Sequence, residues 1–172
     1  SSDPPDVAGG RIKSLTYDGQ TRLRFYRGEF LYWNRGGYQP LNYDDMRAKV
    51  VEYHCRDYFQ VRRDHVSNAI EHIKSKVLVP SFVDSPTWLD PKQGDEWPAI
   101  ECVSTTTGVV HLPSYSAQLP CVRPLTPRFF TTTAVDYGFD ETATEPTTWL
   151  RFLDSLWGDD WQSIATLREF FG

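Results

Sequence analysis

The chain has 172 residues, of which 40% are hydrophobic and 15% aromatic, enough to build one domain or two small ones around a packed core. This composition excludes a largely disordered chain, and no run of about 18 apolar residues is present that could span a membrane. The three cysteines are odd in number and widely spaced, which fits a reducing compartment better than a disulfide framework. We therefore expect an intracellular, cytoplasmic protein.

The net charge of −5 conceals an asymmetry between the two halves of the sequence. Residues 1–79 contain 13 Lys and Arg against 10 Asp and Glu, whereas residues 80–172 contain 5 against 13. A positive first half and a negative second half indicate different partners for the two parts. An ordinary solvated surface, with charges unevenly distributed along the sequence, is an equally good interpretation.

Residues 1–22 are predicted to be an N-terminal extension or linker. From residue 23 to residue 41, β-forming residues cluster around turn signals at Arg27-Gly28 and at 34–37. This pattern predicts a small antiparallel β-meander.

Two helices are predicted to complete the part formed by residues 23–79. Asn42 is expected to cap the first helix, which has acidic residues in its first turn and apolar residues at helical spacing to about residue 59. Asp64 is expected to cap the second helix, and Pro80 to end it.

Four prolines make residues 80–98 a predicted surface connection, which Trp88 and Trp97 should pin to the core. The last part, residues 99–172, begins with β-forming segments. Its predicted strands cover residues 99–104, 109–112 and 128–137, with turns at Gly108 and at 113–116.

The final 30 residues contain the strongest helical pattern. Pro146 is expected at the first position of a helix that Gly158 ends. Asp159, with Gln162 three residues later, resembles a capping box for a last helix. The predicted fold class is therefore α+β, with a β-meander, a two-helix segment, further short strands and a C-terminal helical pair. Because the last helix ends on two Phe residues, we expect the parent protein to continue beyond Gly172.

The sequence contains few residues at the spacing that a catalytic or metal site requires. No Gly-x-x-x-x-Gly-Lys-Ser/Thr loop occurs, so an ATPase site is not expected within these residues. His65 and His72 can share a helix face but lack two further zinc ligands. His111, on a predicted strand, has no obvious carboxylate partner in register. We expect no catalytic residue, metal or cofactor in this chain.

Nucleic-acid binding is the activity that the residues themselves suggest. In the meander, arginines interleave with aromatic residues, and guanidinium groups neutralise phosphates while exposed rings stack on bases. Basic residues between the two helices and at the end of the second helix could contact the phosphate backbone of a DNA duplex. The candidate residues are Arg22, Arg24, Arg27, Trp33, Arg35, Tyr38, Arg62, Arg63, Lys74 and Lys76. The alternative is that the aromatic residues are core, although we expect only one face of the strands to be core.

The second half of the sequence resembles a known family. The motifs are Thr126-Pro127-Arg128-Phe129-Phe130, Tyr137-Gly138-Phe139-Asp140, Trp149-Leu150-Arg151-Phe152-Leu153 after Pro146, and the helix from Ile164 to Gly172. This order resembles the domain immediately N-terminal to the ATPase motor of phage- and plasmid-type and poxvirus-type primase–helicases, which are superfamily 3 DNA helicases. The family usually opens a strand with Asn-Gly, where this chain has Thr107-Gly108. The resemblance covers residues 99–172 well and the meander only loosely.

The resemblance implies a non-catalytic accessory domain of a viral, phage or plasmid replicative DNA helicase that aids DNA binding, ring assembly and coupling to the motor. Its expected partners are DNA, the adjoining ATPase domain and further copies of the protein in a ring. ATP and Mg²⁺ would bind beyond Gly172. One alternative is a pure interaction or collar domain without DNA contact. Another is a nuclease or primase centre on Asp136, Asp140 and Glu141.

Overall fold

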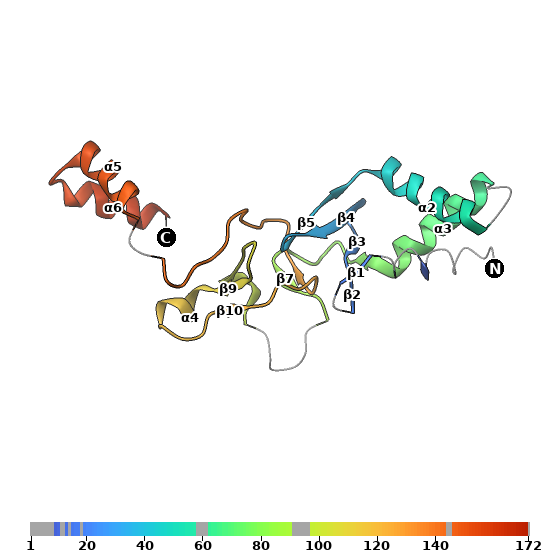
Figure 1. Cartoon of the computed structure of the whole chain (residues 1–172), viewed down its shortest axis with the longest axis horizontal. Helices are drawn as coiled ribbons and strands as arrows, with labels where there is room; N and C mark the ends of the chain where they lie inside the picture. The colour runs from blue at the N-terminus through green and yellow to red at the C-terminus, as the bar shows by residue number, and fades with distance from the viewer. Residues whose placement is uncertain are drawn as a thin grey trace. The chain divides into compact units, whose positions relative to one another are not determined.

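The computed structural model describes residues 9–10, 13, 15–17, 19–57, 62–90, 97–143 and 146–171. The fold is α+β, as predicted, and its elements can be followed in Figure 1. The chain divides into two units, Ser1–Phe139 (unit 1) and Asp140–Gly172 (unit 2). The boundaries predicted after residues 22, 79 and 98 all fall inside unit 1.

A small antiparallel meander forms the main sheet of unit 1, as predicted. Its strands are β3 (Leu23–Tyr26), β4 (Glu29–Asn34) and β5 (Gly37–Leu41). Both turns have positive φ at their two central residues, Arg27 and Gly28 in the first and Arg35 and Gly36 in the second. Two-residue turns of this kind match the right-handed twist of the strands that they join.

A fourth strand, β6 (Leu78–Val79), pairs in parallel with β3. The sequence predicted that the preceding helix would continue to Pro80, but the helix ends at Val77. A two-residue strand is too short to show a periodic pattern, so only its pairing with β3 distinguishes it from a helix end.

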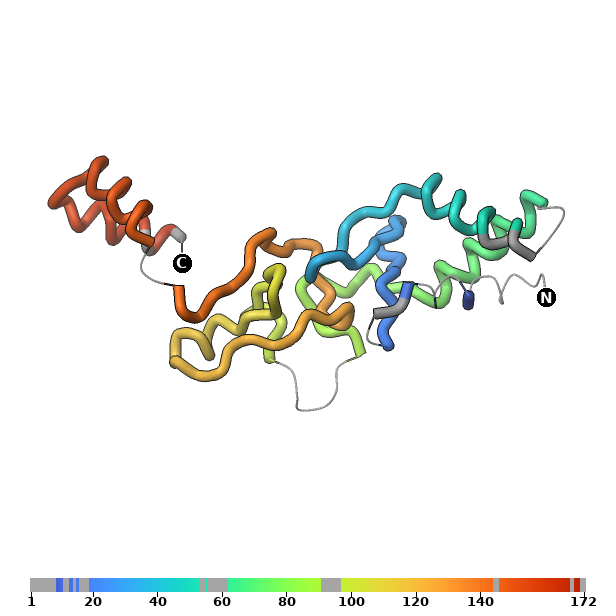
Figure 2. Tube along the Cα trace, in the orientation of Figure 1, coloured from blue at the N-terminus to red at the C-terminus, as the bar shows by residue number. Residues whose placement is uncertain are grey.

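Two helices pack against one face of this sheet and extend beyond it (Figure 2). They are α2 (Tyr43–Asp57) and α3 (Arg63–Val77), which contact each other, and α3 also contacts β3. The buried cluster between helices and sheet consists of Leu23, Phe30, Met46, Val50, Val66, Ala69, Ile70, Ile73 and Val77. Residues 58–59, where the first helix was predicted to end, lie outside the described residues.

The two helices begin differently. Asn42 caps α2 as predicted, because its Oδ1 accepts the backbone N–H groups of Asp44 at 2.8 Å and Asp45 at 3.4 Å. The predicted cap of α3 is wrong. Asp64 lies inside the helix, and Arg62 occupies the N-cap position without a side-chain hydrogen bond to the helix.

The opposite face of the meander is buried as well. The cluster on this face consists of Tyr26, Leu31, Trp33, Tyr38, Val79 and Phe130. Phe130 belongs to β11 (Phe129–Phe130), which pairs antiparallel with β7 (Thr87–Trp88). The predicted Pro-rich connection therefore contains a strand, and the strand predicted at 128–137 is reduced to two residues. Trp88 packs on Phe129, as expected of a residue that pins this segment.

A third sheet has the strand order β10-β9-β8. Its strands are β8 (Cys102–Ser104), β9 (Val109–His111) and β10 (Val122–Arg123). Two assignments differ from the prediction: residues Ala99–Glu101 form a 3-10 helix (η1), and the turn predicted at 113–116 is helix α4 (Leu112–Ser116). Ser104 Oγ donates a hydrogen bond to the Gly36 carbonyl at 2.7 Å and so connects this sheet to the meander.

Part of the predicted N-terminal extension belongs to the fold. Strands β1 (Thr16–Tyr17) and β2 (Gln20–Thr21) form a short antiparallel hairpin. Leu15, next to it, packs against the cluster under α2 and α3, and its carbonyl accepts the Arg22 N–H at 2.7 Å. Residues 1–8 of the predicted extension lie outside the described residues.

Unit 2 is the predicted helical pair, with α5 (Thr147–Trp157) and α6 (Trp161–Phe171). Gly158 ends α5 with a φ of 50°, as predicted, whereas Pro146 is the N-cap and not the first helical residue. The capping residue of α6 is Asp160 and not Asp159. Its carboxylate accepts the N–H of Ser163 at 3.1 Å and the hydroxyl at 2.7 Å, and these bonds hold the pKa of Asp160 below its usual value.

Within the described ranges, no helix is both long enough and apolar enough to cross a membrane.

The three cysteines should differ strongly in reactivity. Cys55 is exposed, whereas Cys102 and Cys121 are buried, and burial raises the pKa of the Cys102 thiol to about 11. Because the thiolate is the reactive form, we expect one thiol of the folded chain to react rapidly with dithionitrobenzoate at about pH 8. The other two should react only after denaturation. Cys55→Ser is the control and should remove the rapid phase; rapid reaction of a second thiol would contradict this packing.

Candidate nucleic-acid interface

Three of the predicted nucleic-acid-binding residues lie in the core of unit 1. The exposed fractions are 9% for Arg24, 4% for Trp33 and 1% for Tyr38. The expectation that only one face of the strands would be core is wrong, because helices cover one face and the β7–β11 region covers the other. A ring enclosed in this way has no face available to a base, so these three residues are removed from the candidate interface.

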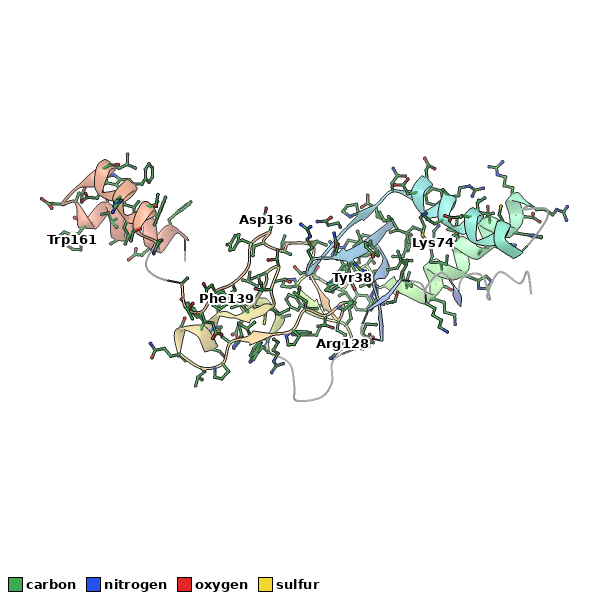
Figure 3. All side chains as sticks on the ribbon, in the orientation of Figure 1. Tyr38, Lys74, Arg128, Asp136, Phe139 and Trp161 are labelled. Atoms are coloured by element: carbon green, nitrogen blue, oxygen red, sulfur yellow. The ribbon has the colours of Figure 1, made fainter. Side chains whose placement is uncertain are left out.

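Tyr38, labelled in Figure 3, has a structural role in the core of unit 1. Its Oη donates a hydrogen bond to the Pro127 carbonyl at 2.6 Å, and its ring packs against Phe130 with the centroids 5.0 Å apart. Burial raises the pKa of Tyr38, and the neighbouring Arg24 guanidinium partly opposes that shift. The Arg24 side chain thus places a cation next to a phenol inside the protein, where its Nε has no hydrogen-bond partner among the described residues.

Two further arginines are engaged within unit 1. Arg22 Nε donates to the Trp33 carbonyl at 3.1 Å, and its guanidinium lies 4.6 Å from the centre of the Tyr32 ring. Arg27 Nη2 lies 2.9 Å from Asp84 Oδ1, and its Nε donates to the Ser81 carbonyl at 3.2 Å. Both arginines therefore hold neighbouring segments together, although Arg27 remains exposed enough to meet a phosphate.

The remaining candidate cations are on the surface. Arg35 lies at the β4–β5 turn, Arg62 and Arg63 at the start of α3, and Lys76 near its end, and all four are exposed. In the described part of the chain, none of the four forms an ion pair. Arg63 and Lys76 are 13 residues apart on α3, which places them about 20 Å from each other along the helix.

A pocket lies beside the last predicted cation, Lys74. Its volume is about 630 Å³, and Phe25, Phe30, Leu41 and Tyr43 line it together with Lys74. Lys74 Nζ lies 5.2 Å from the centre of the Phe25 ring and 2.7 Å from Glu71 Oε1. Tyr43 is half exposed at the pocket. The volume lies within the range of small-molecule sites, and Glu29 adds a carboxylate to the lining.

Tyr43 was not among the predicted binding residues. The pattern that selected Trp33 and Tyr38 was the alternation of Arg and aromatic residues along strands, and Tyr43 follows the helix cap Asn42. The useful signal was the helix start itself, because the cap Asn42 places Tyr43 in the first turn of α2, outside the covered strands.

His111 does have a carboxylate partner, contrary to the prediction. Its Nε2 lies 3.0 Å from Glu101 Oε2, and its Nδ1 lies 2.7 Å from Ser114 Oγ. The Ser114 backbone N–H also points to Nδ1, at 3.4 Å, so His111 caps α4 with Nδ1 as the acceptor, and Nε2 faces Glu101. In serine hydrolases the serine bonds Nε2 and the acid bonds Nδ1, the reverse of this order. One face of the ring is covered by Trp97, with the ring centres 4.8 Å apart. We infer that His111 and the residues around it stabilise the fold.

The three acids of the alternative catalytic centre are divided between the two units. Asp140 Oδ1 accepts the N–H and the hydroxyl of Thr142, at 2.8 Å and 2.7 Å, and these bonds lower the pKa of Asp140. Asp136 belongs to unit 1, whereas Asp140 and Glu141 belong to unit 2. Over the residues that the structure covers, no group of three or more His, Cys, Asp or Glu side chains is placed to hold a metal ion.

Comparison of the sequence with models of known protein families and with curated proteins gave no match.

Replacing Tyr38 by Phe should separate a core role from a binding role. The Pro127 carbonyl would lose its donor inside the protein, so we expect the free energy of unfolding to fall by about 1–3 kcal/mol in urea denaturation. DNA affinity should stay unchanged. Tyr115→Phe, an exposed control, should leave stability unchanged. A fall in DNA affinity without a loss of stability would return Tyr38 to the interface.

Proposed function

We propose that this chain is a non-catalytic accessory domain of a replicative DNA helicase of the primase–helicase type. In this proposal, unit 1 contacts DNA through surface cations, and unit 2 docks on a protein surface. The DNA contact is weak and directed mainly at the phosphate backbone, because the candidate cations are few and spread over unit 1. The motor's ATP and Mg²⁺ chemistry belongs to another part of the parent protein.

The observation that carries the DNA-binding part is the arginine pair at the start of α3. A helix N-terminus carries a partial positive charge, so Arg62 and Arg63 stand where folding favours Asp, Ser or Thr. Their presence there costs stability and concentrates positive charge beside unsatisfied backbone N–H groups. Guanidinium groups and helix N-terminal amides are both groups that bind phosphate. Folding does not account for arginines at this helix start, whereas binding of a phosphate group does.

The pocket at the other end of α3 supports the same proposal. Tyr43 offers a half-exposed ring, and Lys74 places an ammonium group beside the pocket. An aromatic ring next to a cation is the combination that single-stranded nucleic acid uses, with the base on the ring and the phosphate near the cation. A single strand of nucleic acid that runs along α3 would contact both the arginine pair at the start of the helix and the pocket near its end.

Replacing Arg62 by Asp should move stability and DNA affinity in opposite directions. Asp at the N-cap accepts helix N–H groups, so we expect the free energy of unfolding to rise by about 0.5–2 kcal/mol. The same change removes a phosphate contact, so DNA affinity in fluorescence anisotropy at about 50 mM salt should fall and the salt slope should decrease by about 1.

Lys49→Asp is the matched control, because it makes the same change of charge on the exposed side of α2. It should reduce DNA affinity much less than Arg62→Asp. An equal loss in both variants would mean that only the net charge matters. Absence of any binding by the unaltered chain at micromolar concentration would contradict the DNA-binding part.

Replacing Tyr43 by Ala should weaken binding of single-stranded DNA by about 1–3 kcal/mol, the range for loss of one stacked base. Binding of duplex DNA should change little, because paired bases cannot reach the pocket. Tyr115→Ala, at a similarly exposed tyrosine on α4, is the control and should affect neither. Equal losses for single-stranded and duplex DNA would argue against stacking in the pocket.

The second candidate is a collar or interaction domain that does not touch DNA. Two observations favour it: three of the predicted binding residues are buried, and Arg27 and Lys74 already have acidic partners. Light scattering on the purified chain, with DNA-binding measurements on the same sample, distinguishes the two. Self-association without DNA affinity supports the collar.

A further inference from the structure

Helix α5 has a wider apolar side than unit 2 covers. Leu150, Leu153 and Trp157 form one stripe, with Leu153 only 2% exposed. Trp149, Phe152 and Leu156 form a second stripe next to it, also spaced by three and four residues. Their exposed fractions are 43%, 49% and 55%. A pair of short helices has too little interior for both stripes.

Two aromatic side chains of the second stripe pack against each other in the first turn of α5. The rings of Trp149 and Phe152 stack with their centres 5.5 Å apart and their planes 30° apart. These two residues, with Pro146, Thr147 and Thr148, line a shallow, open pocket of about 710 Å³. Tryptophan is among the residues that most often carry binding energy at protein interfaces. The stripe therefore offers an anchor site rather than scattered apolar residues.

The charge of unit 2 indicates what covers the stripe. Residues 140–172 contain seven Asp and Glu against two Arg, a net charge of −5 that equals the charge of the whole chain. Unit 1 is therefore balanced, and the excess negative charge lies entirely in unit 2. A complementary partner is positively charged around its apolar contact.

We propose that the stripe formed by Trp149, Phe152 and Leu156 binds a protein surface that presents an apolar ridge flanked by Lys and Arg. This inference rests on the docking role proposed for unit 2 and adds the chemistry of the partner. A second copy of unit 2 is a poorer occupant, because two surfaces of the same negative charge repel each other. Anionic membranes and nucleic acids are disfavoured for the same electrostatic reason.

The test uses the full chain and a designed helical peptide of about 18 residues, or five turns, with Leu on one face and Lys on the other. A second peptide has Glu at every Lys position. Each peptide carries a fluorophore, and its polarisation is followed as the chain is added. We expect the Lys peptide to bind at least about tenfold more tightly than the Glu peptide, with an affinity that decreases with salt.

Trp149→Ser with Phe152→Ser should weaken binding of the Lys peptide at least about tenfold, because both anchors of the pocket are lost. The matched control is Phe82→Ser with Ile100→Ser, which removes two apolar side chains of unit 1 that are more than three-quarters exposed. The control should leave binding unchanged. Circular dichroism verifies that both double variants stay helical, and Leu156→Ser alone gives a milder change at the same stripe.

Several outcomes would overturn the proposal. Equal binding of both peptides, or equal loss in the control, would show that exposed apolar area alone is responsible. A dimer in light scattering that Trp149→Ser with Phe152→Ser converts to monomer would make a second copy the occupant. Binding to phosphatidylcholine vesicles that the same variant abolishes would make it a lipid surface. None of these results depends on DNA binding by unit 1, so the two proposals can fail separately.

Discussion

The burial of both faces of the β3–β5 meander is the constraint on which the rest of unit 1 depends. Helices α2 and α3 close one face, and the β7–β11 pair closes the other, with Phe130 in contact with Tyr26 and Tyr38. A sheet enclosed in this way uses its aromatic residues for packing and leaves its turns and flanking helix ends for contact with other molecules. The candidate interface consequently lies at Arg35, at the start of α3 and around Tyr43.

The two units divide the chemistry of the chain. Unit 1 is charge-balanced and contains all the buried hydrophobic residues of the described chain except Leu153, whereas unit 2 holds the excess negative charge and a half-exposed apolar stripe. In the functions proposed above, unit 1 contacts an anionic polymer and unit 2 contacts a basic protein surface.

Several polar side chains that resemble parts of a catalytic site instead stabilise the fold. The His111 ring joins Glu101, Ser114 and Trp97, and thereby fixes η1, α4 and the segment before η1. Asp140 and Asp160 each accept hydrogen bonds from a hydroxyl residue two or three positions later. Polar groups of this kind satisfy backbone donors at turns and helix starts, where an unpaired N–H would be costly.

The sequence alone determined the α+β class, the meander, the two following helices and the C-terminal helical pair, because these depend on local periodicity, turn residues and caps. It did not determine β6, β7 or α4, whose few residues have no periodic pattern of their own. Nor did it determine which aromatic residues are exposed. Alternation along a strand shows that Trp33 and Tyr38 share one face and Phe25 and Phe30 the other. Whether a face meets solvent depends on what packs against it from distant parts of the chain, and here Phe130, about 90 residues away, decided it.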